Sequence, residues 1–225
     1  MPFIRGGKIG GMDTAEVAVR SVTDVGPDSV AIAFETPPDF DASPGQFVEI
    51  SVRIDDDLVQ RFFTLSSPAV GDTFEVTVGV DPEGTLTPWL ADREAGDIVG
   101  VSGPYGDVYY EGERRLVILA AGPGIGPAVG IGERAVENGA SVGIIHPADN
   151  TVHVDRLRTL ADKDVSILAA DDGLDGPTAT VMNEIGGTIF VYGFAPFVQD
   201  AIGAIEAAGY DPDEAKVESF GPGPD

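Results

Sequence analysis

Arg61 begins the stretch of the chain whose residue types best suit chemistry, Arg-Phe-Phe-Thr-Leu-Ser-Ser-Pro, which ends at Pro68. A cation precedes two aromatic rings and three hydroxyls, and the proline stops a predicted strand. This mixture suits a flat, partly polar ligand that carries phosphate, because rings stack, hydroxyls bind heteroatoms and guanidinium binds phosphate oxygens. An edge strand with its hydroxyls facing water is the alternative. The candidate ligand-binding residues here are Arg61, Phe62, Phe63, Thr64, Ser66 and Ser67.

A second candidate is a glycine-rich turn between the apolar run Leu116–Ala121 and a helical stretch that extends to Asn138. Glycines in a strand–turn–helix context let the backbone approach a pyrophosphate, whose charge the helix N-terminus favours. A tight turn that needs glycine for steric reasons alone is the alternative. His146-Pro147 stands where the usual Rossmann pattern has an acid, so an ordinary dinucleotide fold is not expected. The turn residues are Gly122, Pro123, Gly124, Ile125, Gly126 and Pro127.

Charge limits the range of partners. The chain has 38 acidic and 13 basic residues among 225, for a formal net charge of -25. Such a charge repels nucleic acid and anionic membrane surfaces, so neither is expected as a partner. An acid excess spread over the whole chain favours a halophilic cytoplasm, where salt screens the self-repulsion. An acidic docking surface for a basic partner is the competing explanation.

Other classes are excluded by composition. The chain has no cysteine, which rules out disulfides, thiolate zinc sites and cysteine-bound iron–sulfur clusters within it. No run reaches the ~20 apolar residues of a membrane span, and Met1 to Met12 lack the apolar core of a signal peptide. A cytoplasmic protein is expected, with residues 1–12 as a possible unstructured lead-in and Met12 as an alternative start. His146 and His153 lack a third ligand for a metal, and no nucleophile order indicates a hydrolase.

Two kinds of element pattern position these motifs. From Glu16 to Gly103 the apolar period is two, which predicts an antiparallel barrel or sandwich with one helix at Thr85–Arg93. The expected strands are Glu16–Thr23, Ser29–Glu35, Gln46–Arg53, Leu58–Leu65, Thr73–Val80 and Ile98–Ser102.

Beyond Arg115 strands and helices alternate, which predicts a parallel sheet with helices on both faces. The expected strands are Leu116–Ala121, Ser141–Ile145, Asp164–Ala170, Thr188–Tyr192 and Lys216–Phe220, and the later helices are Pro177–Ile185 and Pro196–Ala208. The domain boundary is placed near Gly112, which gives domains of residues 1–112 and 113–225.

The order of these features resembles the ferredoxin–NADP reductase superfamily. An antiparallel barrel with Arg-aromatic-aromatic-Thr-x-Ser-Ser is followed by Gly-x-x-Thr and then by a parallel domain with Gly-x-Gly-x-x-Pro, over roughly Glu16 to Phe220. The tail, from Phe197-Val198-Gln199 to Val217-Glu218-Ser219-Phe220-Gly221-Pro222, is most similar to the reductase module of flavohaemoglobins. The resemblance implies a Greek-key FAD-binding barrel and an NAD(P)-binding α/β domain.

It also implies roles for single residues. Arg61 would meet the FAD pyrophosphate, Phe63 would stack on the isoalloxazine without the hydroxyl of the family's Tyr, and Thr64 would bond near flavin N5. Phe220 would cover the other flavin face, or else be a core residue of the last strand. The start of the Gly-x-x-Thr helix would receive pyrophosphate through Gly84, Thr85, Leu86 and Thr87.

One position departs from the family. The family's Cys-Gly-Pro, whose cysteine lies beside the nicotinamide, is replaced by Tyr192, Gly193 and Phe194. Thr64 and Tyr192 are the expected catalytic positions, and Tyr192 is expected to alter nicotinamide approach. Asp171 and Asp172, after the third parallel strand, would repel a 2′-phosphate, which favours NADH over NADPH.

The predicted function is an NAD(P)H-dependent flavin oxidoreductase. Hydride would pass from NADH or NADPH to FAD, and electrons would then pass to a separate ferredoxin, flavodoxin or haem protein. Two alternatives stay open. One is a flavin-bearing electron-transfer subunit that does not oxidise nicotinamide, and the other is a cofactor-free binding or regulatory module.

Overall fold

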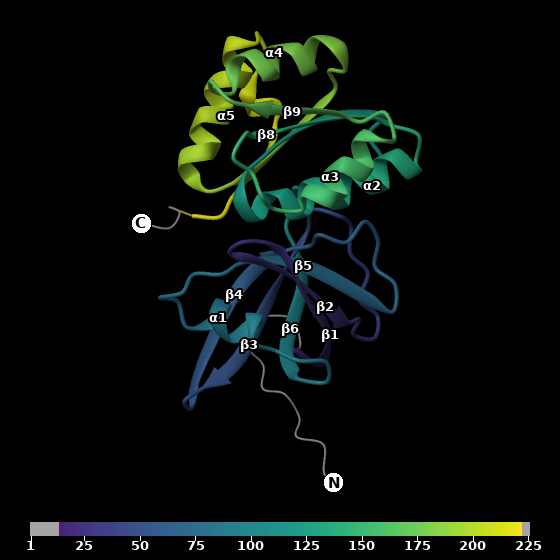
Figure 1. Ribbon diagram of the computed structural model, residues 1–225. Helices are drawn as coiled ribbons and strands as arrows, with labels where there is room; N and C mark the ends of the chain where they lie inside the picture. Colours follow the sequence, from purple (N-terminus) through teal and green to yellow (C-terminus); the bar gives the residue numbers. More distant parts are fainter. Residues whose placement is uncertain (1–13, 222–225) are drawn as a thin grey trace.

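The computed structural model describes residues 14–221 and shows two stacked parts, an all-β part and an α/β part (Figure 1). The predicted lead-in at residues 1–12 and the start at Met12 lie outside the described residues. The first part is an antiparallel sheet of six strands in the order β4-β3-β6-β1-β2-β5. A bridge between Leu65, just after β4, and Val76 of β5 joins the two edges. The strands are β1 (Ala15–Gly26), β2 (Ser29–Glu35), β3 (Phe47–Ile54), β4 (Asp57–Thr64), β5 (Thr73–Gly79) and β6 (Ile98–Tyr105).

The period-two pattern explains these strands. In β3 every second residue, Val48, Ile50 and Val52, is buried in the barrel core. The β3–β4 turn is tight because Asp55 and Asp56 both adopt positive φ, at 51° and 71°. Helix α1 (Leu86–Ala91) is shorter than the predicted Thr85–Arg93 and covers the barrel with Leu86 and Leu90. Of the two expected all-β forms, the edge bridge favours the barrel, and the predicted fold class is confirmed.

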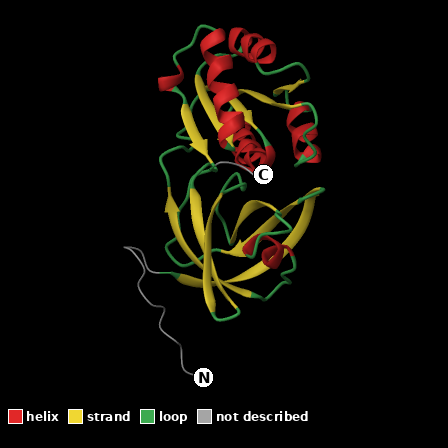
Figure 2. Cartoon of the chain, turned by 90° about the vertical axis from the view of Figure 1, so that its left-hand side faces the viewer, coloured by secondary structure: helices red, strands yellow, loops and turns green. Residues whose placement is uncertain are grey.

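The second part is a parallel five-stranded sheet in the order β11-β10-β7-β8-β9 (Figure 2). Helices α2 and α3 pack on the face that carries Leu116 and Ile118, and helices α4 and α5 pack on the face that carries Val117 and Leu119. The strands are β7 (Arg115–Ala120), β8 (Ser141–Pro147), β9 (Ser166–Ala170), β10 (Thr188–Gly193) and β11 (Lys216–Ser219). The helices are α2 (Ile125–Glu137), α3 (Val154–Ala161), α4 (Asp175–Glu184) and α5 (Ala195–Ala207), with 3₁₀ turns at Gly122–Gly124 and Pro212–Glu214.

Two details of this domain differ from the sequence-based expectation. Helix α3 was not predicted, because its eight residues include Asp155, Arg156 and Arg158 and only two of its side chains, Leu157 and Leu160, are buried. Strand β9 begins at Ser166 rather than at Asp164, since Asp164 has φ 62° and belongs to the preceding turn. Among residues 14–221, no helix is both long and apolar enough to cross a membrane.

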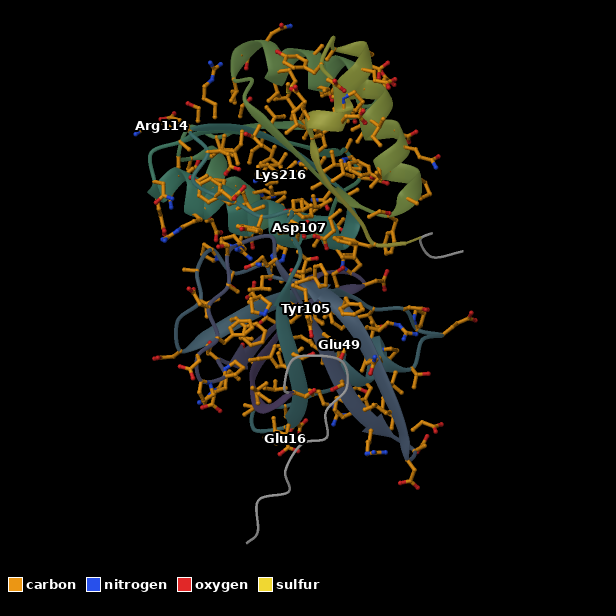
Figure 3. All side chains as sticks on the ribbon, turned by 180° about the vertical axis from the view of Figure 1, so that it is seen from behind. Glu16, Glu49, Tyr105, Asp107, Arg114 and Lys216 are labelled. Carbon is orange, nitrogen blue, oxygen red and sulfur yellow. The ribbon has the colours of Figure 1, made fainter. Side chains whose placement is uncertain are left out.

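The two parts are connected by residues 106–114, and they are in contact where β5 meets the 3₁₀ turn at Gly122–Gly124 and helix α2. Figure 3 labels Asp107 of this connection near the junction of the two parts, and Lys216 of β11 within the α/β part. The ammonium of Lys216 donates to the Tyr109 carbonyl and to the carboxylates of Glu111 and Glu113, at 2.9, 2.8 and 2.7 Å. These bonds attach β11 to the connection. The predicted boundary at Gly112 lies in the connection, and the division into domains of residues 1–112 and 113–225 stays a prediction.

Candidate functional site

A cavity of about 560 Å³ lies between the barrel and the α/β domain. The barrel supplies residues of β3, β4 and β5 and of the start of α1 with the segment before it. The α/β domain supplies residues that follow β7 and β10, and residues at the end of β11 and just after it. Ligands of open α/β sheets bind outside the carboxyl ends of the strands, where the strand order reverses, and here that point lies between β7 and β10. The cavity is lined by Phe47, Arg61, Phe62, Phe63, Thr64, Thr77, Gly79, Asp81, Gly84, Thr85, Leu86, Thr87, Pro123, Phe194, Glu218, Ser219 and Phe220.

Arg61 presents its charge to this cavity. Its side chain is exposed, and among residues 14–221 it forms no salt bridge. One Nη donates to the Gln60 carbonyl at 2.8 Å, which leaves the other N–H groups of the fork available. In a chain of net charge -25, a guanidinium without a carboxylate partner is a strong candidate for an anionic ligand.

Aromatic rings form much of the wall. Phe47 and Phe62 line the cavity and meet edge to face at 5.4 Å. Tyr105, outside the lining, packs behind them, tilted against Phe47 and edge to face with Phe62. Phe63 also lines the cavity and packs its other side against the barrel core. On the α/β side, Phe194 and Phe220 meet edge to face at 6.1 Å. Flat apolar surfaces from both domains therefore face one cavity, which suits a planar ligand.

Thr64 and Glu218 connect the two domains inside the cavity. The Thr64 hydroxyl donates to a Glu218 carboxylate oxygen at 2.7 Å, although the residues are 154 positions apart. Burial raises the pKa of Glu218 from 4.5 to about 7, and the bond from Thr64 opposes this rise only in part. Glu218 can therefore hold or release a proton near neutral pH. The sequence analysis named Glu218 only as part of the tail, and the available signal was an acid two residues before the predicted flavin-facing Phe220.

The segment before α1 and the first residues of α1 place hydroxyls and amides at the cavity. Gly84, Thr85, Leu86 and Thr87 all line it. The Thr87 hydroxyl accepts from the Asp81 backbone N–H at 3.0 Å and keeps its own proton for a ligand. Asp81 also lines the cavity and was not predicted. Its carboxylate accepts from the Glu83 amide at 2.9 Å, which holds this loop in shape.

Most residues of the predicted phosphate loop pack against neighbouring protein groups and do not face open space. A Cβ on Gly124 would meet the Tyr192 carbonyl oxygen, and one on Gly126 would meet the Thr77 hydroxyl. Ile125 and Pro127 are buried in α2. Gly122 has φ 54° and open space around its Cβ position, so it is the loop glycine that a ligand can approach. The steric alternative therefore accounts for Gly124 and Gly126.

Ser66 and Ser67 do not line the cavity. The buried Ser66 hydroxyl donates to Glu75 at 2.8 Å, and the Ser67 hydroxyl accepts from the Glu75 amide at 3.2 Å. The Ser66 carbonyl accepts from Arg156 of α3 at 2.8 Å. These two serines therefore organise the contact between barrel and α/β domain.

Tyr192 and Gly193 lie behind the cavity wall. Tyr192 is fully buried, its ring is parallel to that of Phe190, and its hydroxyl donates to the Val108 carbonyl at 2.8 Å. Burial raises the Tyr192 pKa well above 10, and the charges of Glu218 and Glu113 raise it further. Gly193 is required because a Cβ would meet the ring of Phe197. Phe194, rather than Tyr192, lines the cavity at this corner.

The two histidines are held by local partners. His153 is buried and its Nε2 lies 2.7 Å from the Thr77 hydroxyl, while His146 Nδ1 lies 2.7 Å from the Pro147 carbonyl. Burial, with a smaller contribution from Arg156, lowers the His153 pKa to about 3, so this imidazole is neutral. Among the residues that the structure describes, no group of three metal-binding side chains occurs.

The cavity fits FAD by its chemistry. It offers aromatic faces from both domains for a planar ring system, an open guanidinium for a pyrophosphate and hydroxyls for polar atoms. Its volume lies within the roughly 300–1,000 Å³ of cofactor sites.

Comparison with known proteins agrees with this fit. Residues 16–110 match the family model described as oxidoreductase FAD-binding domain. The 3-ketosteroid-9-alpha-monooxygenase ferredoxin reductase component of Mycolicibacterium smegmatis is 29% identical over 93% of this chain. The chain spans 66% of that relative's length, just under two thirds.

Solved structures extend the similarity to both domains. The FAD/NAD-binding domain of nitric oxide dioxygenase from Vibrio cholerae matches with TM-score 0.75 and 22% identity, over 92% of this chain and 98% of that one. A ferredoxin NADP+ reductase from Neisseria gonorrhoeae with bound FAD and NADP matches with TM-score 0.74 and 18% identity, over 92% and 98%.

The class of the molecule follows from the fold and the cavity: a two-domain flavoprotein scaffold, with an FAD-binding barrel at residues 16–110. The resemblance to the ferredoxin–NADP reductase family, including the reductase modules of flavohaemoglobins, is thereby confirmed.

Proposed function

We propose that the protein is an FAD-dependent oxidoreductase that oxidises a nicotinamide nucleotide and passes electrons to a separate acceptor. The observation that carries this proposal is the single cavity to which the barrel contributes Arg61 and Phe63 and the α/β domain contributes Glu218 and Phe220. When bound, FAD would supply the redox chemistry, and the chain would bind and orient the reactants.

Several residues in and beside the cavity have a proposed part in holding FAD or the nicotinamide nucleotide. Arg61 would bind pyrophosphate oxygens with its free N–H groups, and Phe63 and Phe220 would pack on the planar ring system from the two domains. The amides of Thr85 and Leu86 and the hydroxyl of Thr87 would take further polar atoms, whereas the Gly84 N–H already donates to the Asp81 carbonyl at 3.0 Å. Gly122 would let a phosphate of the nicotinamide nucleotide approach the backbone.

Thr64 and Glu218 would control a proton at the cavity. With a pKa of about 7, the Glu218 carboxyl changes its charge near neutral pH, and Thr64 fixes one of its oxygens at 2.7 Å. The pair can thus neutralise charge that develops on a bound ring. Tyr192 was predicted to be catalytic. In this proposal it has a structural role, since its hydroxyl donates to the Val108 carbonyl.

NADH is the proposed reductant. The carboxyl end of β9 is followed by the exposed acids Asp171 and Asp172, which oppose a 2′-phosphate. Arg156 is unavailable to such a phosphate because Glu133 and Glu75 hold its guanidinium. The acceptor would be a ferredoxin, flavodoxin or haem protein, because a chain without cysteine holds no cysteine-bound cluster. A relative named as a ferredoxin reductase component supports this choice. Halophilic and cytoplasmic character stay predictions.

A second candidate is an electron-transfer subunit that no longer oxidises nicotinamide. The observation in its favour is the contact between Phe194 and Phe220, because these two rings line the part of the cavity where the nicotinamide is expected. Rapid mixing with NADH separates the two candidates, because fast bleaching of the flavin excludes the second.

The first test is the visible spectrum of the purified protein after loading with FAD. Arg61→Ala is expected to weaken FAD binding about 10- to 100-fold, the equivalent of one charge-assisted hydrogen-bond partner. Arg53→Ala is the matched control, since Arg53 is outside the cavity lining and donates to the Asp56 carbonyl. Absence of flavin absorbance in the wild type, or equal affinities for Arg61→Ala and Arg53→Ala, contradicts the proposal.

A further inference from the structure

Phe194 and Phe220 form an edge-to-face pair in the cavity wall of the α/β domain. Their ring centroids are 6.1 Å apart and the ring planes are at 89°. Phe194 follows β10 and precedes the first residue of α5, and Phe220 follows β11. Both rings are partly buried and both line the cavity. We name these two residues the Phe194–Phe220 pair.

The backbone around the Phe194–Phe220 pair is held on both sides. The Phe220 N–H donates to the Gly193 carbonyl at 2.9 Å, and the Ala195 N–H donates to the Gly221 carbonyl at 2.8 Å. Strands β10 and β11 pair in parallel up to Gly193 and Ser219. The segment that carries Phe220 therefore cannot leave the wall without breaking two backbone hydrogen bonds. Rotation of the Phe220 side chain alone costs less.

The position of Phe194 is also fixed. Gly193 packs so closely on Phe197 that a Cβ at 193 would lie 2.7 Å from the Phe197 ring. The Phe194 carbonyl accepts from the Val198 N–H at 3.0 Å as the first turn of α5 begins. The backbone of Phe194 is therefore held in place, and the contact of its ring with Phe220 favours one orientation of the Phe220 side chain.

This contact matters if FAD occupies the cavity, as the proposed function states. Phe220 and a nicotinamide ring are both flat, and only one of them can pack on the same face of a planar cofactor. Transfer between two bound rings requires direct contact of the reacting atoms. A ring that is held over the cavity therefore competes with the nicotinamide.

We propose that Phe194 is a positioning residue that holds the Phe220 ring over the cavity and so sets how readily a nicotinamide replaces it. The inference rests on the proposed function and deepens it, because it assigns nicotinamide affinity to a residue that replaces the family's proline. An aromatic pair contact corresponds to an equilibrium shift of about 2- to 12-fold. Loss of the contact should change nicotinamide affinity by that factor.

The test uses the FAD-loaded full chain with Phe194→Leu and Phe194→Pro. Leucine keeps apolar bulk, and proline fits the observed φ of -74° at this position. The probe is NAD+, titrated while the flavin absorbance spectrum is followed, so that binding is measured without turnover. Both variants are expected to lower the dissociation constant of NAD+ by about 2- to 12-fold. The KM for NADH should fall by a similar factor while FAD content stays constant.

Two controls separate positioning from general damage. Tyr210→Leu removes an aromatic ring elsewhere in the same domain, outside the cavity lining, and should leave NAD+ affinity unchanged. In a Phe220→Ala background, Phe194→Leu should have no further effect on NAD+ affinity, because the ring that it positions is gone.

The outcomes are distinguishable. An unchanged NAD+ affinity in flavin-loaded Phe194→Leu overturns this inference and leaves the proposed function intact. The same gain in the presence and absence of the Phe220 ring also overturns it. A wild type that binds no FAD overturns the proposed function and this inference with it.

Discussion

Arg156 of α3 connects the two domains, and its replacement should lower the free energy of unfolding. Its guanidinium donates two hydrogen bonds to the carboxylate of Glu133 in α2, at 2.8 and 2.7 Å. It also donates to two acceptors of the barrel, the Glu75 carboxylate at 3.0 Å and the Ser66 carbonyl at 2.8 Å. The side chains of Arg156, Glu75 and Glu133 are 24%, 31% and 23% exposed, so water screens them only partly.

The expected cost follows from this burial. Breaking a fully buried ion pair costs about 3–5 kcal/mol, because a charge remains without a partner, and an exposed pair is worth about 0–1 kcal/mol. Arg156→Met keeps the apolar stem and leaves the carboxylates of Glu133 and Glu75 without their cation, although Glu75 keeps the bond from the Ser66 hydroxyl. With about a quarter of each group in contact with solvent, we expect a loss of about 2–3 kcal/mol in the free energy of unfolding.

Denaturant unfolding measures this loss, and Arg158→Met is its matched control. Arg158 lies on the same helix but is 74% exposed, and within residues 14–221 its one ion-pair partner is Asp155, which is 96% exposed. The control should change the stability by less than about 0.5 kcal/mol. In the double variant Glu75→Gln with Arg156→Met, the total should be smaller than the sum by about 1 kcal/mol, since one unpaired charge is removed. Equal stabilities of Arg156→Met and Arg158→Met would refute the reasoning.

Two other expectations follow from single contacts. Glu218 has a folded pKa of about 7 against 4.5 when unfolded, so the unfolded chain binds fewer protons between these values and stability falls as the pH rises through this window. Glu218→Gln should therefore be more stable than the wild type above pH 7, by about 3 kcal/mol, and equally stable below pH 4.5. Denaturant unfolding at several pH values measures this difference in stability. A difference that does not change with pH would argue against the assigned pKa. Gly130→Ala of α2 would bring a Cβ to 2.7 Å from the Ser66 carbonyl oxygen and should cost about 1–3 kcal/mol, whereas Gly203→Ala of α5 meets open space and should gain about 1 kcal/mol. A stabilised Gly130→Ala in the same unfolding assay would mean that α2 does not press on the barrel there.

A fourth expectation concerns Tyr192. Tyr192→Phe removes the hydrogen bond from the Tyr192 hydroxyl to the Val108 carbonyl and should lower the free energy of unfolding by about 1–2 kcal/mol. The rate of flavin reduction by NADH should not change, because the hydroxyl does not line the cavity. A large drop in that rate with unchanged stability would restore Tyr192 to the catalytic part first predicted for it.

Much of the fold could be predicted because the local pattern of apolar residues indicates the strands. The alternation of Val48, Ile50 and Val52 marks β3, and the apolar run that begins at Leu116 marks β7 as a strand buried on both faces. Helix α3 was missed because a short helix with two buried leucines gives a weak periodic signal. The fold class was therefore determined by long, strongly patterned segments, and the error fell on a short charged one.

The sequence by itself determined the type of ligand, since Arg61, Phe63 and Thr64 are neighbours on one strand and their chemistry is readable without the rest of the chain. Only the tertiary structure decided which groups meet. It placed Glu218 at 2.7 Å from Thr64, and it turned Tyr192 away from the cavity while Phe194 faced it. The physical reason is that pKa values, burial and ring contacts depend on residues far apart in the chain, and these distances are set by how α2 and β11 pack on the barrel.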